Sequence, residues 1–364
     1  MNNKRKPEWT PANSGKEFTS SIIEGKKTVH PPIAHLVKEK HYNLDALVNG
    51  VLKSDRTLLA KAITLIESNA EKHFEMGQEL IKELLPFSGK SIRIGITGIP
   101  GVGKSTFIEN FGLYLIEKGH KVAVLAIDPS STLSKGSILG DKTRMEILSQ
   151  NISSFIRPSP SAGILGGVAR KTRETIILCE AAGYDIILIE TVGVGQSEIT
   201  VRSMVDFFLL MQIAGAGDEL QGIKRGIIEL ADLIVFNKAD GDNIPRTELA
   251  KQELQNVLHY IRNATQDWQT KVLACSAINK TGLASIWENI SAFQELTQKN
   301  GYFAKRRREQ NIEWFHNLID ESVLHNFYRK EKVKSLVTQL KDEVANGNIP
   351  VALAVKMILE AGAE

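Results

Sequence analysis

The fold is decided by the stretch Gly98-Ile99-Pro100-Gly101-Val102-Gly103-Lys104-Ser105, which has the spacing G-x-x-x-x-G-K-[ST] of a phosphate-binding loop. Apolar residues alternate through 92–96 just before it, which predicts a strand, and they recur every fourth residue through 107–115 after it, which predicts a helix. A glycine-rich turn with a chance lysine would need neither flanking element. Strand, loop and helix in this order therefore indicate a site for a nucleoside triphosphate.

The residue types of this loop suit phosphate chemistry. Glycines let the backbone turn its N–H groups toward phosphate oxygens, and the following helix adds its dipole and its unpaired N–H groups. We expect Lys104 to reach the β- and γ-phosphates as a catalytic residue, and the Ser105 hydroxyl to coordinate Mg²⁺. The predicted nucleotide-binding residues here are Gly98, Ile99, Pro100, Gly101, Val102, Gly103, Lys104, Ser105 and Thr106.

Composition and charge narrow the class of protein. The 364 residues include 45 basic and 42 acidic side chains, a net charge of +3, which gives no reason to expect nucleic acid as the main partner. Cys179 and Cys275 lie far apart in apolar stretches, and we expect both to be buried in a reducing compartment. No apolar run is long enough to span a membrane, and acidic residues at 8, 17 and 24 argue against an organellar transit peptide. We therefore expect a cytoplasmic protein that binds neither nucleic acid nor membrane.

Sequence patterns divide the chain into four parts. Residues 1–40 are polar, contain four prolines and lack periodicity, so we expect a poorly ordered or loosely docked tail. Residues 41–89 form an N-terminal helical segment, in which Ser54 or Asp55 can cap a helix. Strands and helices alternate through 90–298, which predicts an α/β domain with a mostly parallel sheet flanked by helices. Residues 299–364 are helical again and form a C-terminal extension.

Buried strands of a parallel sheet are expected as short apolar runs. Such runs lie at 122–127, 186–189, 207–213, 233–236 and 272–274, with a weaker one at 153–156. Helices are expected between them, for instance at 168–182 and 248–263. The stretch 128–167 is rich in Ser, Pro and Gly, and its length within a compact domain indicates a functional loop.

The C-terminal extension carries a charge run and two apolar stripes. We expect the charge run at 305–308 to be a solvated helix face, Gly347 to stop a helix, and Pro350 to lie in the first turn of the last helix. The stripes are Phe315, Ile319, Val323 and Phe327, and then Val333, Leu336, Leu340 and Val344. A helical hairpin cannot bury both stripes on itself, which favours a homodimer contact. Packing back onto the core is the alternative.

A second motif, Asn237-Lys238-Ala239-Asp240, follows directly on an apolar run. An N-K-x-D sequence at a strand end, downstream of a phosphate loop, indicates guanine specificity. The Asp240 carboxylate can accept from both N1–H and the 2-amino group of guanine, whereas adenine would leave it unpaired. The Lys238 stem can cover the plane of the base.

Two further strand ends add candidate residues. Ser276-Ala277-Ile278 closes the run 272–274, and its position resembles the short loop of GTPases in which a backbone N–H bonds guanine O6. Glu190 follows the run 186–189 at the sheet end where ligands of open α/β sheets bind. Glu190 can hold Mg²⁺ through water, and the Gly193 N–H can meet the γ-phosphate, so both join Lys104 as predicted catalytic residues.

Asp128 and Asp141 complete the predicted metal site with Ser105 and Glu190. Asp128 ends the strand at 122–127, and Asp141 lies in the long loop that follows. Either can instead be a solvated loop carboxylate. Mg²⁺ usually takes one or two protein carboxylates and keeps several waters, so some of these acids should act through water.

The order of these motifs resembles the methylmalonyl-CoA mutase-associated GTPases of the MeaB/ArgK type, within the SIMIBI class of P-loop GTPases. The resemblance covers about residues 45–300 well and the remaining tail more loosely. It rests on the segments 98–106, 126–131, 140–145, 157–161, 165–169, 190–197, 217–224 and 237–240.

The resemblance implies a P-loop GTPase that binds GTP or GDP with Mg²⁺ and docks on an adenosylcobalamin-dependent acyl-CoA mutase. Such a partner uses GTP to gate cofactor loading and to protect or repair the mutase. The nucleotide-responsive loops would correspond to about 128–144, 193–198 and 215–225. None of this follows from composition or spacing.

Several residue types argue for or against related functions. Val194 follows Gly193 where a Ras-like enzyme has a water-orienting glutamine, so we expect low intrinsic hydrolysis that a partner raises. The eight histidines are scattered and there is no Cys-x-Cys-Cys cluster, which counts against metal delivery. Two alternatives remain. One is a kinase or GTP-binding regulator linked to amino-acid transport, although the chain has no H-R-D kinase loop. The other is a GTP-binding scaffold that does not hydrolyse.

Overall fold

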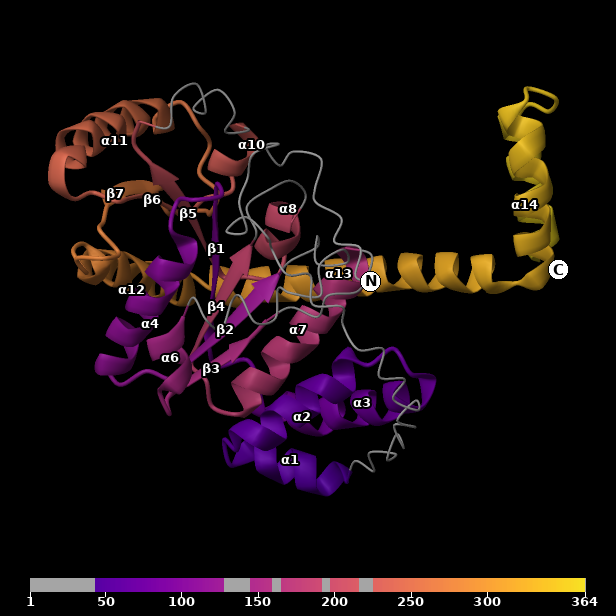
Figure 1. Cartoon of the computed structure of the whole chain (residues 1–364), viewed down its shortest axis with the longest axis horizontal. Helices are drawn as coiled ribbons and strands as arrows, with labels where there is room; N and C mark the ends of the chain where they lie inside the picture. Colours follow the sequence, from indigo (N-terminus) through magenta and orange to yellow (C-terminus); the bar gives the residue numbers. More distant parts are fainter. Residues whose placement is uncertain (1–42, 128–144, 159–164, 192–196, 216–224, 364) are drawn as a thin grey trace, which may run out of the picture. The chain divides into compact units, whose positions relative to one another are not determined.

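A computed structural model describes residues 43–127, 145–158, 165–191, 197–215 and 225–363. Within these ranges one sheet has the strand order β3-β2-β4-β1-β5-β6-β7, and every neighbouring pair is parallel (Figure 1). The strands are β1 (Ile92–Gly98), β2 (Val122–Ile127), β3 (Ser154–Arg157), β4 (Ile186–Thr191), β5 (Phe207–Ile213), β6 (Leu233–Asn237) and β7 (Lys271–Ala274). The predicted α/β fold with a parallel sheet is confirmed, and each predicted apolar run lies within or overlaps a strand.

The strands are apolar because helices cover both faces of the sheet. Ile94 of β1 lies opposite Leu188 of β4 and Phe207 of β5, and all three belong to one buried cluster. Because crossover connections keep the strands parallel, their carboxyl ends share one edge of the sheet. The phosphate loop follows β1 at this edge, and the N-K-x-D motif begins at the end of β6.

The helices of the α/β part lie on both faces of the sheet (Figure 1). They are α4 (Lys104–Glu117), α6 (Glu146–Gln150), α7 (Leu165–Ala181), α8 (Ser197–Arg202), α10 (Arg225–Ile228), α11 (Ile244–Leu258) and α12 (Leu283–Lys299), with a short 3₁₀ turn η3 (Gly241–Asn243). Helices α4 and α12 cover the face of Ile94 with Phe107, Phe111 and Phe293. On the other face α8 packs against Gly95, where a Cβ atom would lie 2.9 Å from Val201.

One predicted helix is displaced. The sequence predicts a helix at 248–263, whereas α11 runs from Ile244 to Leu258. Pro245 lies in its first turn, where its fixed φ and missing N–H suit a helix start. The proline therefore begins the helix four residues earlier than the apolar pattern alone indicated.

The N-terminal segment contains α1 (Leu44–Leu52), α2 (Arg56–Glu67), α3 (Glu71–Leu84) and a 3₁₀ turn η2 (Leu85–Phe87). Asp55 caps α2, because its Oδ1 accepts from the N–H groups of Thr57 at 2.8 Å and Leu58 at 2.9 Å. Ser54 instead donates its hydroxyl to the Ala182 carbonyl at 2.6 Å. The choice between the two predicted caps is thereby decided. Helix α1 was not predicted as a separate element.

The C-terminal extension contains α13 (Tyr302–Arg329), α14 (Glu331–Ala345) and α15 (Val351–Ala363). Gly347 follows α14 with a φ of 71°, as predicted for a helix stop. Pro350 was predicted to lie inside the last helix but precedes it by one residue. Its carbonyl accepts from the N–H groups of Leu353 and Ala354, so it closes the first turn from outside.

The predicted solvated face at 305–308 is wrong for two of its four residues. Arg306 is 8% exposed. The Arg307 guanidinium donates to both carboxylate oxygens of Asp206, at 2.7 and 2.6 Å, and to the carbonyls of Gly89 and Ser91 at 2.6 Å each. These partners lie at least 100 residues away in sequence, so no local pattern could indicate them. The start of α13 is thereby fixed to the sheet.

This ion pair sets the protonation of Asp206. Burial alone would raise the pKa of that carboxyl, but the hydrogen bond and charge of Arg307, with the charge of Arg93, hold it below its ordinary value. A carboxylate with a lowered pKa contributes stability at neutral pH that is lost only as the pH falls through that lowered value.

The two apolar stripes differ in burial. On α13, Phe315 is 61% exposed and Val323 60% exposed, whereas Val333 of α14 is fully buried. Phe327, at the end of the first stripe, packs on Gly362 of α15, where an added Cβ would lie 1.9 Å from its ring. Part of the second stripe is thus covered within the helical extension, and most of the first is not.

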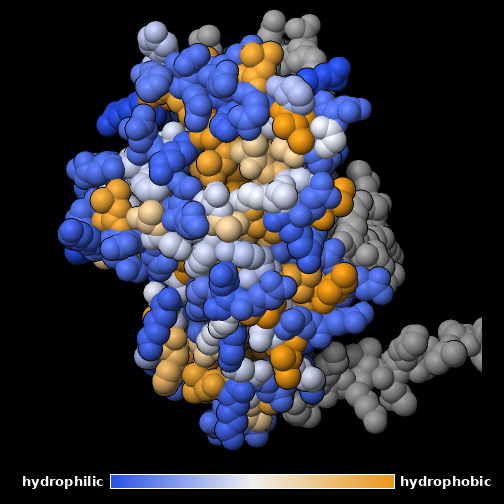
Figure 2. Space-filling model, turned by 90° about the vertical axis from the view of Figure 1, so that its left-hand side faces the viewer, coloured by the Kyte–Doolittle hydropathy of each residue, from blue (hydrophilic) through white to orange (hydrophobic). Residues whose placement is uncertain are grey.

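The surface of the described residues carries both apolar and hydrophilic side chains. On the face shown in Figure 2, apolar residues form several separate small groups between hydrophilic ones. Across the described ranges, no helix has both the length and the apolar character that crossing a bilayer requires. Both cysteines are buried and unpaired, and their predicted burial is confirmed.

Candidate functional site

The phosphate loop has a positive φ, which favours glycine, at Gly98, where φ is 153°, and at two further positions. Gly101 and Gly103 have φ values of 81° and 92°, in the left-handed region. A Cβ atom on Gly103 would lie 2.8 Å from the Asn237 side-chain nitrogen. Any larger residue at 103 would therefore push the phosphate loop away from the base-recognition motif.

Lys104 is the first residue of α4 and is 8% exposed. Its ammonium donates to the carbonyls of Gly98 at 2.6 Å and Ile99 at 3.3 Å. An ammonium group has three donors, so one is left for a phosphate oxygen within the loop. Burial lowers the pKa of Lys104, while the charges of Glu190 and Glu198 raise it. The phosphate loop thus holds the Lys104 ammonium in place through these two carbonyls.

Ser105 and Glu190 lie together at the carboxyl edge of the sheet. The Ser105 hydroxyl donates to Glu190 Oε1 at 3.2 Å, and Glu190 pairs with Ile96 of β1 in the register. A hydroxyl and a carboxylate are the hard oxygen donors that Mg²⁺ prefers, so the two residues fit a metal bound beside the phosphate loop. The other predicted metal ligands, Asp128 and Asp141, and the predicted catalytic Gly193 lie outside the described residues.

Asn237, the first residue of the N-K-x-D motif, is hydrogen-bonded to both the phosphate loop and the loop Ser276-Ala277-Ile278. Its side-chain nitrogen donates to the carbonyl of Val102 in the phosphate loop at 2.8 Å. Its Oδ1 accepts from the backbone N–H of Ala277 at 3.1 Å and faces the Cys275 thiol at 3.4 Å. Burial, together with the charge of Asp240, raises the pKa of Cys275 to about 12, so the thiol stays protonated and can donate. The asparagine therefore fixes the distance between the phosphate site and the base site.

The base side of the site is formed by Asp240, Ser276 and Lys238. The Ser276 hydroxyl donates to Asp240 Oδ2 and accepts from the N–H of Asn279 at 3.2 Å. Lys238 has a φ of 60°, is exposed, and has its Cε 3.9 Å from where a Cβ on Gly103 would lie. Its stem therefore runs beside the phosphate loop, where it can cover a base held by Asp240.

The predicted loop Ser276-Ala277-Ile278 is present at the end of β7, beside the N-K-x-D motif. Ala277 is buried, and its backbone N–H is directed to Asn237, while Ile278 is 73% exposed. In this arrangement the Ala277 N–H would have to share its hydrogen bond to reach guanine O6. The structure thus brings the predicted base-contacting residues together at one end of the sheet.

Comparison with known proteins shows the family of the chain. The family profile described as "Methylmalonyl Co-A mutase-associated GTPase MeaB" matches residues 59–332. The chain belongs to this family. The GTPase is 44% identical over 313 residues to "GTPase ArgK" of Escherichia coli (strain K12), covering 86% of this chain and 95% of that protein. It is 44% identical over 334 residues to "Methylmalonic aciduria type A homolog, mitochondrial" of Mus musculus, covering 89% and 80%.

A solved structure agrees with these relatives. The GTPase superposes on the "Crystal structure of LAO/AO transport system kinase" with a TM-score of 0.71 and 37% identity, covering 88% of this chain and 98% of that one. The predicted resemblance to MeaB/ArgK GTPases is confirmed, as is the prediction that the chain is an enzyme that hydrolyses GTP.

The sequence did not single out two buried polar features of this GTPase. The hydroxyl of Thr191, at the end of β4, donates to that of Thr97, near the end of β1, at 2.8 Å and joins the two strand ends under the nucleotide site. Glu198 is 2% exposed, and its Oε2 has no hydrogen-bond partner among the described residues. Glu198 lies in the segment 193–198, which the sequence predicts to respond to the nucleotide. Its burial, however, is what shows that the carboxylate faces inward near Lys104.

Proposed function

We propose that this GTPase is a chaperone of an adenosylcobalamin-dependent acyl-CoA mutase of the methylmalonyl-CoA mutase type. In this proposal the GTPase uses GTP to gate the loading of the cofactor into the mutase. It also protects or reactivates the mutase. The observation that carries the proposal is the Asn237 bridge, because it joins a phosphate loop to a guanine motif in a chain of the mutase-associated family.

The residues would divide the work as follows. Backbone N–H groups of the phosphate loop bind the phosphates, and Lys104 places its remaining donor on the β- and γ-phosphates. Asp240 accepts from the guanine edge, and Lys238 covers the base. Ser276, Ala277 and Ile278 form the neighbouring wall of the base site, as the resemblance to GTPases implies.

Magnesium would be held by Ser105, with Glu190, Asp128 and Asp141 acting directly or through water. When bound, it neutralises charge on the phosphate oxygens during transfer to water. The Gly193 N–H is proposed to contact the γ-phosphate. With Val194 after Gly193, the chain itself offers no glutamine there to orient water, so hydrolysis should be slow until the mutase binds.

A homodimer through the C-terminal extension is part of this proposal. It is supported by the exposed apolar residues Phe315, Ile319 and Val323 on one stripe of α13. An exposed stripe of this kind favours contact with another protein surface. A cytoplasmic location is also proposed.

The second candidate function is a kinase linked to amino-acid transport. The solved protein that superposes with a TM-score of 0.71 is named a transport system kinase. That name is the reason to test for kinase activity. A kinase would transfer the γ-phosphate to a protein or small molecule, whereas a GTPase releases it as inorganic phosphate. Radiolabelled GTP incubated with a native extract separates the two, because only the first leaves label on an acceptor.

Cofactor loading tests the chaperone proposal directly. Apo-mutase is mixed with adenosylcobalamin and this GTPase, and loading is followed by the absorbance of the bound cofactor. We expect the rate or extent of loading to differ between GTP and GDP, and the difference to vanish with Lys104→Ala. Equal loading with GTP, with GDP and without the GTPase would overturn the proposal.

A further inference from the structure

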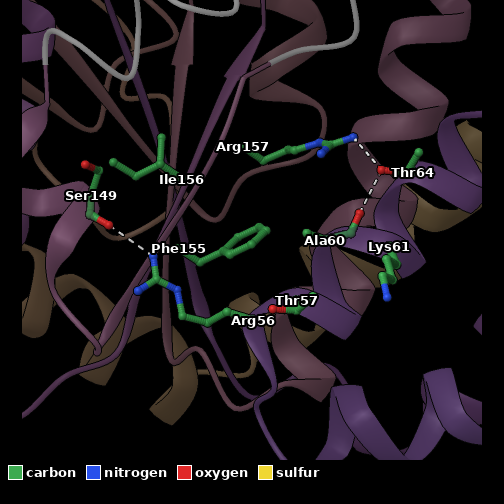
Figure 3. A pocket seen from close by; sticks show the side chains of 9 residues that line it. All are labelled: Arg56, Thr57, Ala60, Lys61, Thr64, Ser149, Phe155, Ile156 and Arg157. Carbon is green, nitrogen blue, oxygen red and sulfur yellow. Dashed lines mark hydrogen bonds between the residues drawn. The ribbon is translucent and has the colours of Figure 1, made fainter.

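A second pocket lies beside the outermost strand of the sheet. In the strand order, β2 and β4 separate β3 from β1 and its phosphate loop. The cavity between α2 and β3 has a volume of about 490 Å³, within the range of small-molecule sites (Figure 3). It is lined by Arg56, Thr57, Ala60, Lys61, Thr64, Ser149, Phe155, Ile156 and Arg157.

The lining of this pocket is cationic. Three of its nine residues are basic and none is acidic. Arg157 is paired with Glu67, whose Oε1 lies 3.1 Å from its Nε. Among the residues that the structure describes, Arg56 donates only to neutral carbonyls, those of Asn151 and Ser149 at 3.1 Å each. Within the described part of the chain, a positive charge in the pocket is therefore left without an anionic partner.

Lys61 adds to this charge. Its side chain is exposed, and its ammonium makes no hydrogen bond or ion pair with any residue that the structure describes. Together with Arg56 it leaves two cationic groups without an anionic partner in the described part of the chain. Two such groups in one cavity indicate an anionic ligand.

The shape of the pocket follows from α2 and β3. Thr57, Ala60, Lys61 and Thr64 share one face of α2, opposite its buried face, and three of them are short side chains that leave the cavity open. Phe155 and Ile156 of β3 are 6% and 8% exposed and form an apolar wall. A dry wall strengthens electrostatic contacts beside it.

The two arginines mark the ends of the cavity. Arg56 begins α2, whereas Arg157 ends β3 and donates to the Thr64 hydroxyl at 3.3 Å. Figure 3 shows the Phe155 ring between them. Eight residues of helix separate Arg56 from Thr64, a span of about 12 Å. Both guanidinium groups are held in place by their own hydrogen bonds, so the pocket is preorganised.

We propose that this pocket binds a small organic polyanion with one phosphate or carboxylate group at Arg56 and another at Lys61, because Arg157 is already paired with Glu67. The ligand would join α2 to the edge of the sheet. The site is separate from the nucleotide site and does not depend on the proposed mutase function.

Titration calorimetry on the GDP- and Mg²⁺-loaded protein tests this, because saturating GDP blocks the phosphate loop. The probes are fructose 1,6-bisphosphate and the dicarboxylate suberate, each with anionic groups at both ends. We expect at least one to bind with one site and a dissociation constant below about 1 mM. Binding of the bisphosphate alone, or of suberate alone, supports the site and assigns its ligand to phosphates or to carboxylates.

Charge reversal at Lys61 provides the residue-level test. K61E should weaken binding at least about tenfold without lowering the thermal midpoint, since the side chain has no partner in the described fold. K82E is the matched control, because Lys82 is an exposed lysine on α3 that does not line the pocket. Hydrogen exchange should slow in 56–67 when the probe binds. The proposal is overturned if neither probe binds, if GDP competes with the probe, or if K82E weakens binding as much as K61E.

Discussion

Replacing Asp240 by asparagine should change which base the GTPase accepts. The ionised carboxylate is an acceptor only, which suits the two donors on the guanine edge. Xanthine has a carbonyl in place of the 2-amino group, so a carboxylate repels it. The Asp240→Asn variant should lose affinity for GTP and gain affinity for xanthosine triphosphate.

The structure indicates how the new amide would be oriented. The Ser276 hydroxyl donates to Asp240 and accepts from the Asn279 N–H. Because that hydroxyl still needs an acceptor, it favours the amide oxygen and leaves the amide nitrogen facing the base. A nitrogen donor there meets the 2-carbonyl of xanthine favourably and the 2-amino group of guanine unfavourably.

The expected size of the effect follows from the lost hydrogen bond. Losing a charged hydrogen bond in a desolvated site costs about 2–3 kcal/mol, or about two decades in affinity. Competition binding with GTP, ATP and xanthosine triphosphate on both proteins measures it. Asp242→Asn is the control, because Asp242 is exposed, lies in η3, and makes no hydrogen bond or ion pair among the described residues.

Three results would contradict this expectation. The wild type could prefer ATP, which would remove the guanine assignment. Asp240→Asn could keep its preference for GTP, which would mean that the carboxylate does not contact the base. Finally, Asp242→Asn could show the same loss of GTP affinity, which would mean that the loss comes from the change in net charge and not from a contact of Asp240 with the base.

Lys104→Ala should abolish triphosphate binding, because the loop loses its positive charge at the β/γ-phosphates; near-normal affinity in filter binding would show that the lysine does not bind phosphate. Arg307→Met should lower the free energy of unfolding by about 3–5 kcal/mol in urea titrations, because it removes the ion-pair partner of the buried Asp206 carboxylate and leaves it the Arg93 N–H. A change below about 1 kcal/mol would show that the ion pair does not fix α13. Ile319→Lys with Val323→Lys should give a monomer by light scattering, since both residues are exposed on the apolar stripe and away from the Arg307 contacts; an unchanged dimer would place the interface elsewhere.

Local patterns in the sequence were sufficient to predict the strands of the sheet, the phosphate loop and the N-K-x-D motif. The phosphate loop and the N-K-x-D motif each depend on a few adjacent residues whose types are set by the ligand. Their meeting in space follows from parallel strands, because β1 and β6 end at the same edge. Asn237 joins them as that topology requires.

Long-range pairing explains what the sequence did not predict. The charge run at 305–308 resembles any solvated helix face, because Asp206 lies 101 residues from Arg307 and carries no local signal of its partner. The pocket at β3 depends on the spacing between α2 and an edge strand, which single-element patterns do not contain. The inward orientation of Glu198 likewise depends on packing, since a polar residue in a glycine-containing motif is usually exposed.

The proposed function requires that this GTPase hydrolyses GTP in response to an acyl-CoA mutase. Phosphate release from GTP, measured for the purified protein with and without methylmalonyl-CoA mutase, tests this requirement without further assumptions. We expect slow release alone, a rise of about tenfold or more when the mutase is added, and no release by Lys104→Ala in either case. A rate that the mutase leaves unchanged would contradict the proposed function.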